Sequence, residues 1–388
     1  MRSAALILVL LPVFASGCFL LNPSPKAVAR SYYNRGVGLE AKGDKIGAIK
    51  QYAAAIRVYP DYFEAYMRRG SLLAEDRNYN GAIEDFNHAI DIRPEAIAYY
   101  NRGLAWSKKG DLDKADADLT EAISWDPTDA AAYTERGVIR HRKKNFDGAI
   151  EDYTKAIKMD PQKAIAYSNR GIARYSKGDM TAALADYEQS IHINPRNGDA
   201  YVERARVLDH LGNSEEAIAD CSKAIDADPG NGLAYLMRGY ILGKKGDREH
   251  AIADYTRAIE INPKDVHAYY DRAAVWLELK NPGQAVADCT RAIELDPSNT
   301  VPYLNRAMAR SNMGDHEGAL ADLTTVIELS PEDAEAYGQR GLEFLYLADR
   351  NKSKQDFAVC FSLDRKLERS YKTKAAEIER AKITAVRK

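Results

Sequence analysis

Residues 99–127 read YYNRGLAWSKKGDLDKADADLTEAISWDP and contain the features that decide the fold. Apolar and small residues recur every three to four positions on both sides of Gly110-Asp111, which is the spacing of two amphipathic helices. Glycine favours the left-handed conformation that ends a helix, and aspartate favours the residue that caps the next one. Pro127 follows the second pattern and ends it. The stretch therefore predicts two helices joined by a tight turn.

The same sequence unit occurs ten times along the chain. Its proline recurs at intervals of 34 residues, with one interval of 33, and a tyrosine and an arginine three residues apart recur in step with it. One helical pair of this size cannot bury its apolar face alone, so the units must stack on one another. The repeating tyrosines are Tyr32, Tyr66, Tyr99, Tyr133, Tyr167, Tyr201, Tyr235, Tyr269, Tyr303 and Tyr337.

This repeat resembles the tetratricopeptide repeat over residues 29–367, in its period and in its small residues at fixed places. The resemblance implies an all-α fold, a right-handed α-solenoid (superhelix) of helix–turn–helix repeats whose first helices line a concave surface. The chain departs from the family in having Tyr where Trp is common, and in a tenth copy that carries Ser353 and Cys360. Residues 368–388 are strongly charged, and we expect them to form a helix that caps the last repeat.

The first residues have the features of an export signal. Residues 1–17 contain Arg2 and then an apolar run that is too short to span a bilayer as a mature helix. Small residues precede Cys18, and this ending resembles the lipobox of bacterial lipoproteins. The resemblance implies that Cys18 is the lipid-attachment residue, that residues 18–28 are a short linker, and that the protein is anchored in the outer membrane facing the periplasm. Cleavage without lipid, giving a secreted or periplasmic protein, remains an alternative.

Composition and motifs argue against several functional classes. Lys and Arg number 55 against 57 Asp and Glu, so the chain lacks the basic excess of a nucleic-acid binder. It has no phosphate-binding loop, no HExxH motif and no GxSxG motif, and its seven histidines do not have the spacing of metal ligands. We therefore expect no enzyme activity, no cofactor, no metal site and no small-molecule substrate.

An aspartate follows the repeating arginine by sixteen residues in nine of the ten units, for example Asp186 after Arg170. Two readings are open: an ion pair between the helices of each unit, or an arginine ladder that binds anions. Because the opposite charges repeat together, the structural ion pair is favoured.

Some positions of the first helices differ from repeat to repeat, and we expect the specific function of the protein to depend on these variable positions. The residue after each repeating tyrosine, and the residue four positions further on, should lie on the concave side and are mainly apolar or aromatic. Either neighbouring helices cover this stripe or a partner binds it. The candidate partner-binding residues are Tyr33, Met67, Tyr100, Leu104, Tyr240 and Tyr270.

The sequence thus predicts a non-catalytic protein–protein interaction scaffold, a membrane-anchored envelope lipoprotein that binds peptide segments or protein partners in its concave groove. Two alternatives are an accessory subunit of an envelope enzyme or of a secretion or assembly complex, and a solenoid that binds a solute or glycan.

Overall fold

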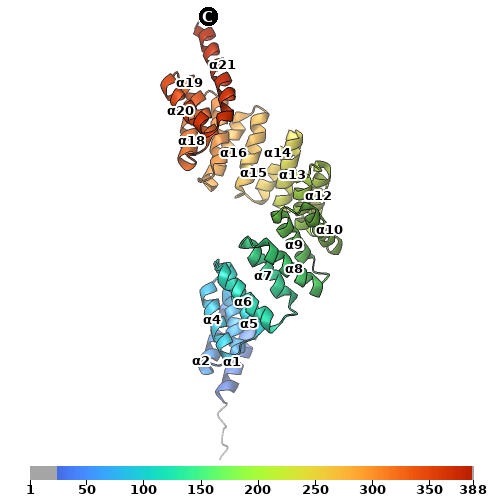
Figure 1. Cartoon of the computed structure of the whole chain (residues 1–388). Helices are drawn as coiled ribbons and strands as arrows, with labels where there is room; N and C mark the ends of the chain where they lie inside the picture. Colours follow the sequence, from blue (N-terminus) through green and yellow to red (C-terminus); the bar gives the residue numbers. More distant parts are fainter. Residues whose placement is uncertain (1–23, 387–388) are drawn as a thin grey trace, which may run out of the picture. The chain divides into compact units, whose positions relative to one another are not determined.

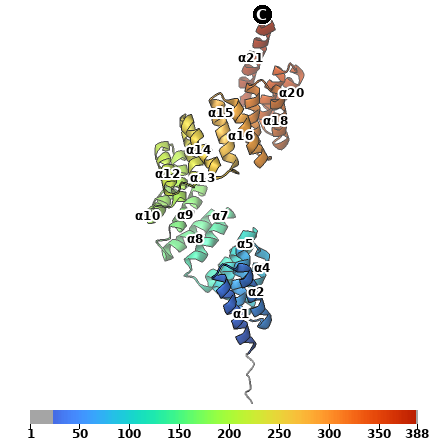
Figure 2. The ribbon, with the colours of Figure 1, turned by 180° about the vertical axis from the view of Figure 1, so that it is seen from behind.

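The computed structural model describes residues 24–386, so the predicted signal peptide, residues 1–17, and Cys18 lie outside the described part of the chain. Within residues 24–386 every regular element is a helix (Figures 1 and 2). The helices are grouped into two compact units, Met1–Asp160 and Pro161–Lys388. The predicted all-α solenoid of helix–turn–helix repeats is confirmed.

The first unit contains four repeats. In each of them the first helix packs most extensively on the second helix of the same repeat, and within the unit every second helix except the last also packs on the first helix of the following repeat. The helices in chain order are α1 (Pro25–Glu40), α2 (Lys45–Val58), α3 (Phe63–Glu75), α4 (Tyr79–Ile92), α5 (Ala96–Lys109), α6 (Leu112–Trp125), α7 (Ala130–Arg142) and α8 (Phe146–Met159).

The second unit contains six repeats and a further C-terminal helix. Its elements are α9 (Ala164–Lys177), α10 (Met180–Ile193), α11 (Gly198–His210), α12 (Ser214–Ala227), α13 (Gly232–Lys245), α14 (Arg248–Ile261), α15 (Val266–Glu278), α16 (Pro282–Leu295), α17 (Thr300–Asn312), α18 (His316–Leu329), α19 (Ala334–Tyr346), α20 (Arg350–Leu363), the short 3-10 helix η1 (Arg365–Leu367) and α21 (Glu368–Val386).

The turn inside each repeat has the predicted geometry. Gly110 ends α5 with a φ of 97°, and the Asp111 carboxylate accepts a hydrogen bond from the Lys114 N–H of α6 at 3.2 Å. Where glycine is missing at this turn, another residue is held in the same left-handed region, for example Lys280 with a φ of 57°. Because a side chain is strained there, these turns are weak points of the repeats. The non-glycine residues in this conformation are Arg77, Lys144, Lys280 and Ala348.

Close approach of the two helices explains the small residue that follows the repeating arginine. A Cβ on Gly137 would lie only 2.6 Å from Cε1 of Tyr153 on the second helix. In two of the repeats that have Ala instead of Gly, the residue on the opposing helix is smaller than tyrosine. Ala205 packs in one core cluster with Cys221, and Ala273 packs in another with Cys289. The residue pairs are therefore complementary in volume.

Helix α21 packs on α19 and, less extensively, on α20. The ring of Tyr371 occupies the space beside Gly338, where a Cβ would overlap it, and the Tyr371 hydroxyl donates to the Glu335 carbonyl at 3.3 Å. Lys382 Nζ donates to the Leu345 carbonyl at the C-terminal end of α19. The apolar end of the last repeat is thus covered by a helix whose other face is polar.

The helices within residues 24–386 lack the features of a membrane span. None of them has both the length and the apolar character needed to cross a bilayer.

Candidate functional site

The first helices of successive repeats touch one another directly, and together they form the surface predicted to be concave. We call the outward side of α1, α3, α5 and α7, and likewise of α9, α11, α13, α15, α17 and α19, the first-helix face of its unit. Lys244 of α13 forms an ion pair with Asp209 of α11 at 2.7 Å, and Asn305 of α17 donates to the Tyr270 carbonyl of α15 at 3.4 Å. Side chains on this face therefore lie between adjacent repeats.

The four candidate residues of the first unit are all half-buried. The Tyr33 ring lies 5.2 Å from the Tyr62 ring, between the first and second repeats. Met67 packs against two core clusters, and Tyr100 packs against the cluster around Leu119. Burial raises the pKa of Tyr100 to about 12. Neighbouring helices thus cover much of the predicted stripe here, and these side chains contribute to packing between repeats.

The two candidate residues of the second unit lie on adjacent helices, Tyr240 on α13 and Tyr270 on α15. Tyr240 is 45% exposed, whereas Tyr270 is half-buried. The Tyr270 hydroxyl forms a hydrogen bond with Nδ1 of His267, which lies one helical turn earlier on the same face. Tyr255 of the second helix α14 is buried, and burial raises the pKa of its hydroxyl.

Asp271 follows Tyr270 directly in α15 and was not among the candidate residues predicted from the sequence. Its side chain is half-buried, and within residues 24–386 it has neither a hydrogen-bond donor nor an ion-pair partner. Burial raises the pKa of its carboxyl group to about 6. A signal was present in the sequence, because the second residue after the repeating tyrosine is acidic in alternate repeats, at Glu135, Glu203 and Asp271.

Exposed apolar residues form a second series on the first-helix faces. The second residue before the repeating tyrosine is a large apolar residue, at least 40% exposed, in alternate repeats. His267 stands at the same position and contacts Tyr270, which places the series on the first-helix face. Each member of this series is the second residue of its helix, and the exposed large apolar residues of the second helices also lie mostly at helix ends. The exposed series consists of Ile97, Ile165, Leu233 and Val301.

The repeating arginines are structural. Arg238 donates from Nε and Nη2 to both carboxylate oxygens of Asp254 at 2.8 Å, and from Nη1 to the Ser222 hydroxyl of the preceding repeat at 3.0 Å. Equivalent Nη2–Oδ1 bonds of 2.6 to 2.9 Å confirm the predicted ion pair in nine repeats. The pairs are Arg69–Asp85, Arg102–Asp118, Arg136–Asp152, Arg170–Asp186, Arg204–Asp220, Arg238–Asp254, Arg272–Asp288, Arg306–Asp322 and Arg340–Asp356.

Two adjoining pockets, of about 270 and 570 Å³, lie where α17, α19 and α21 meet. Leu342, Tyr346 and Lys374 line both of them. At the base of the smaller one the buried Glu343 carboxylate accepts a hydrogen bond of 2.6 Å from the Ser311 hydroxyl. This is a mixed apolar and polar recess on the first-helix face.

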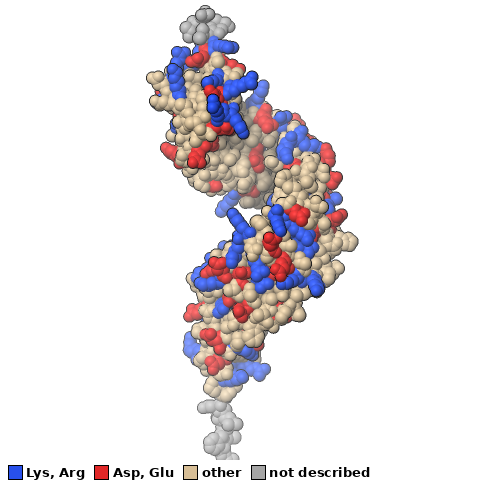
Figure 3. Space-filling model, in the orientation of Figure 1, with Lys and Arg blue, Asp and Glu red and all other residues tan. Residues whose placement is uncertain are grey.

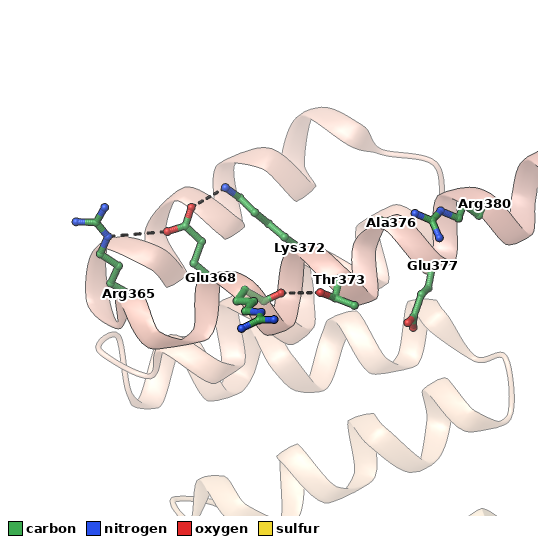
Figure 4. A pocket seen from close by; sticks show the side chains of 8 residues that line it. Arg365, Glu368, Lys372, Thr373, Ala376, Glu377 and Arg380 are labelled. Carbon is green, nitrogen blue, oxygen red and sulfur yellow. Dashed lines mark hydrogen bonds and ion pairs between the residues drawn. The ribbon is translucent and has the colours of Figure 1, made fainter.

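A larger and more open pocket, of about 650 Å³, lies along the outward side of α21 (Figure 4). It is lined by charged side chains of both signs, and Glu368 already has partners there in Lys372 at 2.6 Å and Arg365 at 4.0 Å. A surface of this kind is solvated helix rather than an enclosed site.

The side chains of the described residues support neither a metal-binding site nor a reactive thiol at Cys221 or Cys289. Residues 24–386 contain no group of three His, Cys, Asp or Glu side chains arranged to hold a metal ion. Cys221 and Cys289 are fully buried, and burial raises the pKa of each thiol to about 12. These two cysteines are packing residues in thiol form.

Comparison with known proteins bears on the family and the fold. A tetratricopeptide repeat model matches residues 33–97, 168–232 and 236–300, which together make up half of the chain. Further tetratricopeptide repeat models match residues 96–129 and 302–333, and a TPR repeat model matches residues 137–178.

A curated relative, sperm-associated antigen 1 of Mus musculus, is 35% identical over 65 residues, which are 16% of this chain and only 7% of the mouse protein. Among solved structures, a tetratricopeptide repeat protein from Parabacteroides merdae has a TM-score of 0.50 at 20% identity, covering 64% of this chain and 98% of its own. The APC/C hetero-tetramer Cut9–Hcn1 gives a TM-score of 0.53 at 14% identity, covering 89% of this chain and 84% of its own. Both structures share the fold, and with the repeat models they show that the chain belongs to the tetratricopeptide repeat family.

Proposed function

We propose that this protein is a non-catalytic interaction scaffold that binds polypeptide segments along its first-helix face. The observation that carries the proposal is the contrast between the repeated and the variable positions. The repeated arginines and aspartates are paired with one another inside the repeats, whereas Tyr240, Met308 and the apolar series remain exposed on the first helices. Exposed aromatic, methionine and aliphatic side chains on one face are typical of binding surfaces.

The distribution of charge supports a partner that covers a long surface. Acidic and basic side chains are interspersed over the visible side of each unit (Figure 3), so no single-sign field dominates it. A solenoid offers an extended surface rather than a single deep pocket. One of the two solved structures described above is a hetero-tetramer of Cut9 with Hcn1, which is a protein assembly. A protein or peptide partner therefore fits this chain better than a solute or glycan.

The test compares exposed residues of the two faces. Tyr240→Ala combined with Met308→Ala should weaken capture of a partner, by about 2 kcal/mol if these residues are hot spots, with little effect on the melting temperature. Tyr100 and Tyr270 are less suitable, because both are half-buried and their truncation would also cost stability. Undiminished capture by the double variant, with loss of capture on substitution of the exposed Trp125 of α6, would refute the proposal.

We further propose that Cys18 is acylated and anchors the protein in the bacterial outer membrane, facing the periplasm. The support is the sequence alone: an apolar run, small residues and then Cys18. Two or three acyl chains suffice for stable anchoring, at about 0.8 kcal/mol per buried methylene. Cys18→Ala should release the protein from membranes or block its processing. A mature protein that incorporates no fatty-acid analogue during metabolic labelling would show that the signal is cleaved without lipidation.

An accessory subunit of an envelope enzyme or of a secretion complex is the same proposal with a specified partner. Identification of the polypeptide bound to the first-helix face decides between this role and a general scaffold.

A further inference from the structure

The last step of the first-helix face differs from the earlier ones, because a third helix takes part in it. Helix α21 packs on α19, and side chains of α17, α19 and α21 together line the two adjoining pockets of about 270 and 570 Å³. We call these two pockets the terminal recess. A polypeptide that follows the first helices of the second unit therefore meets a hollow with an additional wall at this point.

The base of the terminal recess contains a buried charge that the other repeats lack. The third residue after the repeating arginine is small or apolar in the other nine repeats, for example Val207 and Ala309, and is Glu343 in the tenth. Glu343 is only 5% exposed. One of its carboxylate oxygens accepts a hydrogen bond from the Ser311 hydroxyl at 2.6 Å, and the other lies 2.7 Å from Nδ1 of His316. Both oxygens thus have partners inside the protein.

This polar group holds an aromatic wall in place. The His316 imidazole, bound to Glu343, stacks on the Tyr346 ring with the ring centres 4.3 Å apart and the planes at 7°. Tyr346 is 41% exposed and lines both pockets together with Leu342, and the exposed Met308 lines the smaller one. A side chain whose orientation is already fixed loses little conformational freedom when a ligand binds. The wall therefore favours burial of a large apolar group.

Two amide side chains of the smaller pocket favour a polypeptide as the ligand. Gln339 of α19 is half-buried and Asn312 of α17 is exposed, and both line this pocket. Within residues 24–386 neither side-chain amide forms a hydrogen bond. Each amide offers both donors and an acceptor, which match the carbonyl and N–H groups of an extended main chain.

The charge that remains available in the terminal recess is positive beside the smaller pocket. Lys382 Nζ already donates to two main-chain carbonyls at the end of α19, at 2.6 and 2.8 Å. Lys374 lines both pockets and is exposed; its Nζ lies 5.3 Å from the centre of the Tyr371 ring and makes no ion pair within the described residues. Glu377 lines the larger pocket only. An acidic group of a ligand is therefore complementary to Lys374.

We propose that the terminal recess binds a large apolar side chain of the partner polypeptide together with an acidic residue next to it. The apolar side chain packs against Tyr346 and Leu342, and the acidic residue pairs with Lys374. The amides of Gln339 and Asn312 bind the main chain between them. The inference rests on the proposed function, since it assigns a site and a ligand chemistry to the face on which a polypeptide binds.

The experiment measures binding of labelled, end-blocked hexapeptides to the full chain by fluorescence anisotropy. The peptide Gly-Leu-Phe-Asp-Asp-Gly carries both features, and its counterparts replace Leu-Phe by Ala-Ala, or Asp-Asp by Asn-Asn or Lys-Lys. The wild type should bind the first peptide roughly tenfold more tightly than the Ala-Ala peptide, because the aromatic wall contacts the apolar side chain. It should prefer the Asp-Asp peptide several-fold over the Asn-Asn peptide, and the Lys-Lys peptide should bind most weakly.

Three variants test the assignment. Ala381→Trp should lower the affinity for the Leu-Phe-Asp-Asp peptide by roughly tenfold, because the indole fills the larger pocket that Ala381 lines. Lys374→Gln should lower the affinity for this peptide several-fold and leave that of the Asn-Asn peptide unchanged, since only the charge is lost. Glu377→Gln should raise the affinity for the acidic peptide, because it removes the negative charge of the larger pocket.

Two control variants make matched changes on the outward side of α21. Ala376→Trp and Arg369→Gln replace exposed residues that line the open surface there (Figure 4), and both should bind the peptides like the wild type. Absence of the wild-type preference for the Leu-Phe-Asp-Asp peptide, wild-type affinity of Ala381→Trp or Lys374→Gln, or equal losses in the controls would each overturn the inference. The scaffold proposal would still stand if Tyr240→Ala with Met308→Ala loses its partner while Ala381→Trp retains it.

Discussion

Arg238 and Asp254 are joined by two parallel hydrogen bonds of 2.8 Å between the two helices of one repeat, and Asp254 is only 6% exposed. The Nη1 group of Arg238 also donates to Ser222 of the preceding repeat. One side chain thus links three helices. This geometry makes the arginine series part of the framework and not a ladder that binds anions.

Removing one side chain of this ion pair should lower the free energy of unfolding more than removing both side chains together. Arg238→Ala and Asp254→Ala should each lower the free energy of unfolding by about 3 kcal/mol, because each leaves a charge without its partner. The double variant should cost clearly less than the sum of the two, as urea unfolding can measure. Strictly additive losses would mean that the two side chains act independently.

The close fit of Gly137 against Tyr153 predicts that Gly137→Ala destabilises the wild type but does not destabilise a protein with a smaller residue at position 153. Gly137→Ala in the wild type should destabilise by about 1 to 3 kcal/mol, because the new methyl group meets the Tyr153 ring at 2.6 Å. In a Tyr153→Cys background the same change should be neutral or should stabilise by up to about 1 kcal/mol, since it recreates the Ala205 and Cys221 pair and favours the helix. Thermal unfolding of the four proteins measures both effects, and an equal cost in both backgrounds would argue against the packing explanation.

The turn conformations predict a reciprocal pair of variants. Lys280 has a φ of 57°, and Gly246, at the same turn one repeat earlier, has a φ of 86°. Lys280→Gly should stabilise the protein by about 1 kcal/mol, and Gly246→Lys should destabilise it by a similar amount. Unfolding midpoints in urea test this, and a loss of stability in Lys280→Gly would contradict the reading.

Much of the fold could be predicted from the sequence because the repeat fixes it many times over. Gly110-Asp111 marks the turn, and the sixteen-residue offset between arginine and aspartate spans the two helices of a repeat. These are local or single-repeat relationships, and each occurs in most copies. The volume match of Ala205 with Cys221 was not predicted, because it depends on how closely the two helices approach.

The candidate site was predicted less well, since it depends on contacts between repeats. Tyr33 and Tyr100 stand at positions expected on the concave side, yet adjacent helices half-bury them. Asp271 was missed because a single acidic residue gives no sign of whether a neighbour neutralises it. The acidic residues at alternate repeats were visible in the sequence, but Glu203 forms an ion pair with Arg206 whereas Asp271 forms none within residues 24–386, and only the structure separates the two.

Asp271 also predicts how stability depends on pH. Burial raises the pKa of its carboxyl group to about 6, above the ordinary value of about 3.8, so the folded protein holds this proton more tightly than the unfolded chain does. The cost of burying the charge is therefore absent at pH 3.5, grows as the pH rises and is complete above pH 6. Asp271→Asn should accordingly stabilise the free protein by about 1 to 3 kcal/mol at pH 7.5, and by little at pH 3.5.

Urea unfolding of the wild type and Asp271→Asn at the two pH values measures this difference. His267→Gln serves as the control for titration of the neighbouring imidazole. An Asp271→Asn variant less stable than the wild type at pH 7.5 would contradict this account. The charged groups that act on the Asp271 carboxylate are His267 and Asp265, both near the start of α15.

The measurement that tests the central claim most directly is site-specific photo-crosslinking in cells. A photoreactive phenylalanine analogue is placed at Tyr240 or Met308 on the first-helix face, and at Trp125 or Lys223 on the second helices, all of them exposed. The account predicts that Tyr240 and Met308 give adducts with a defined polypeptide and that the second-helix positions give none. Adducts confined to Trp125 and Lys223 would contradict it.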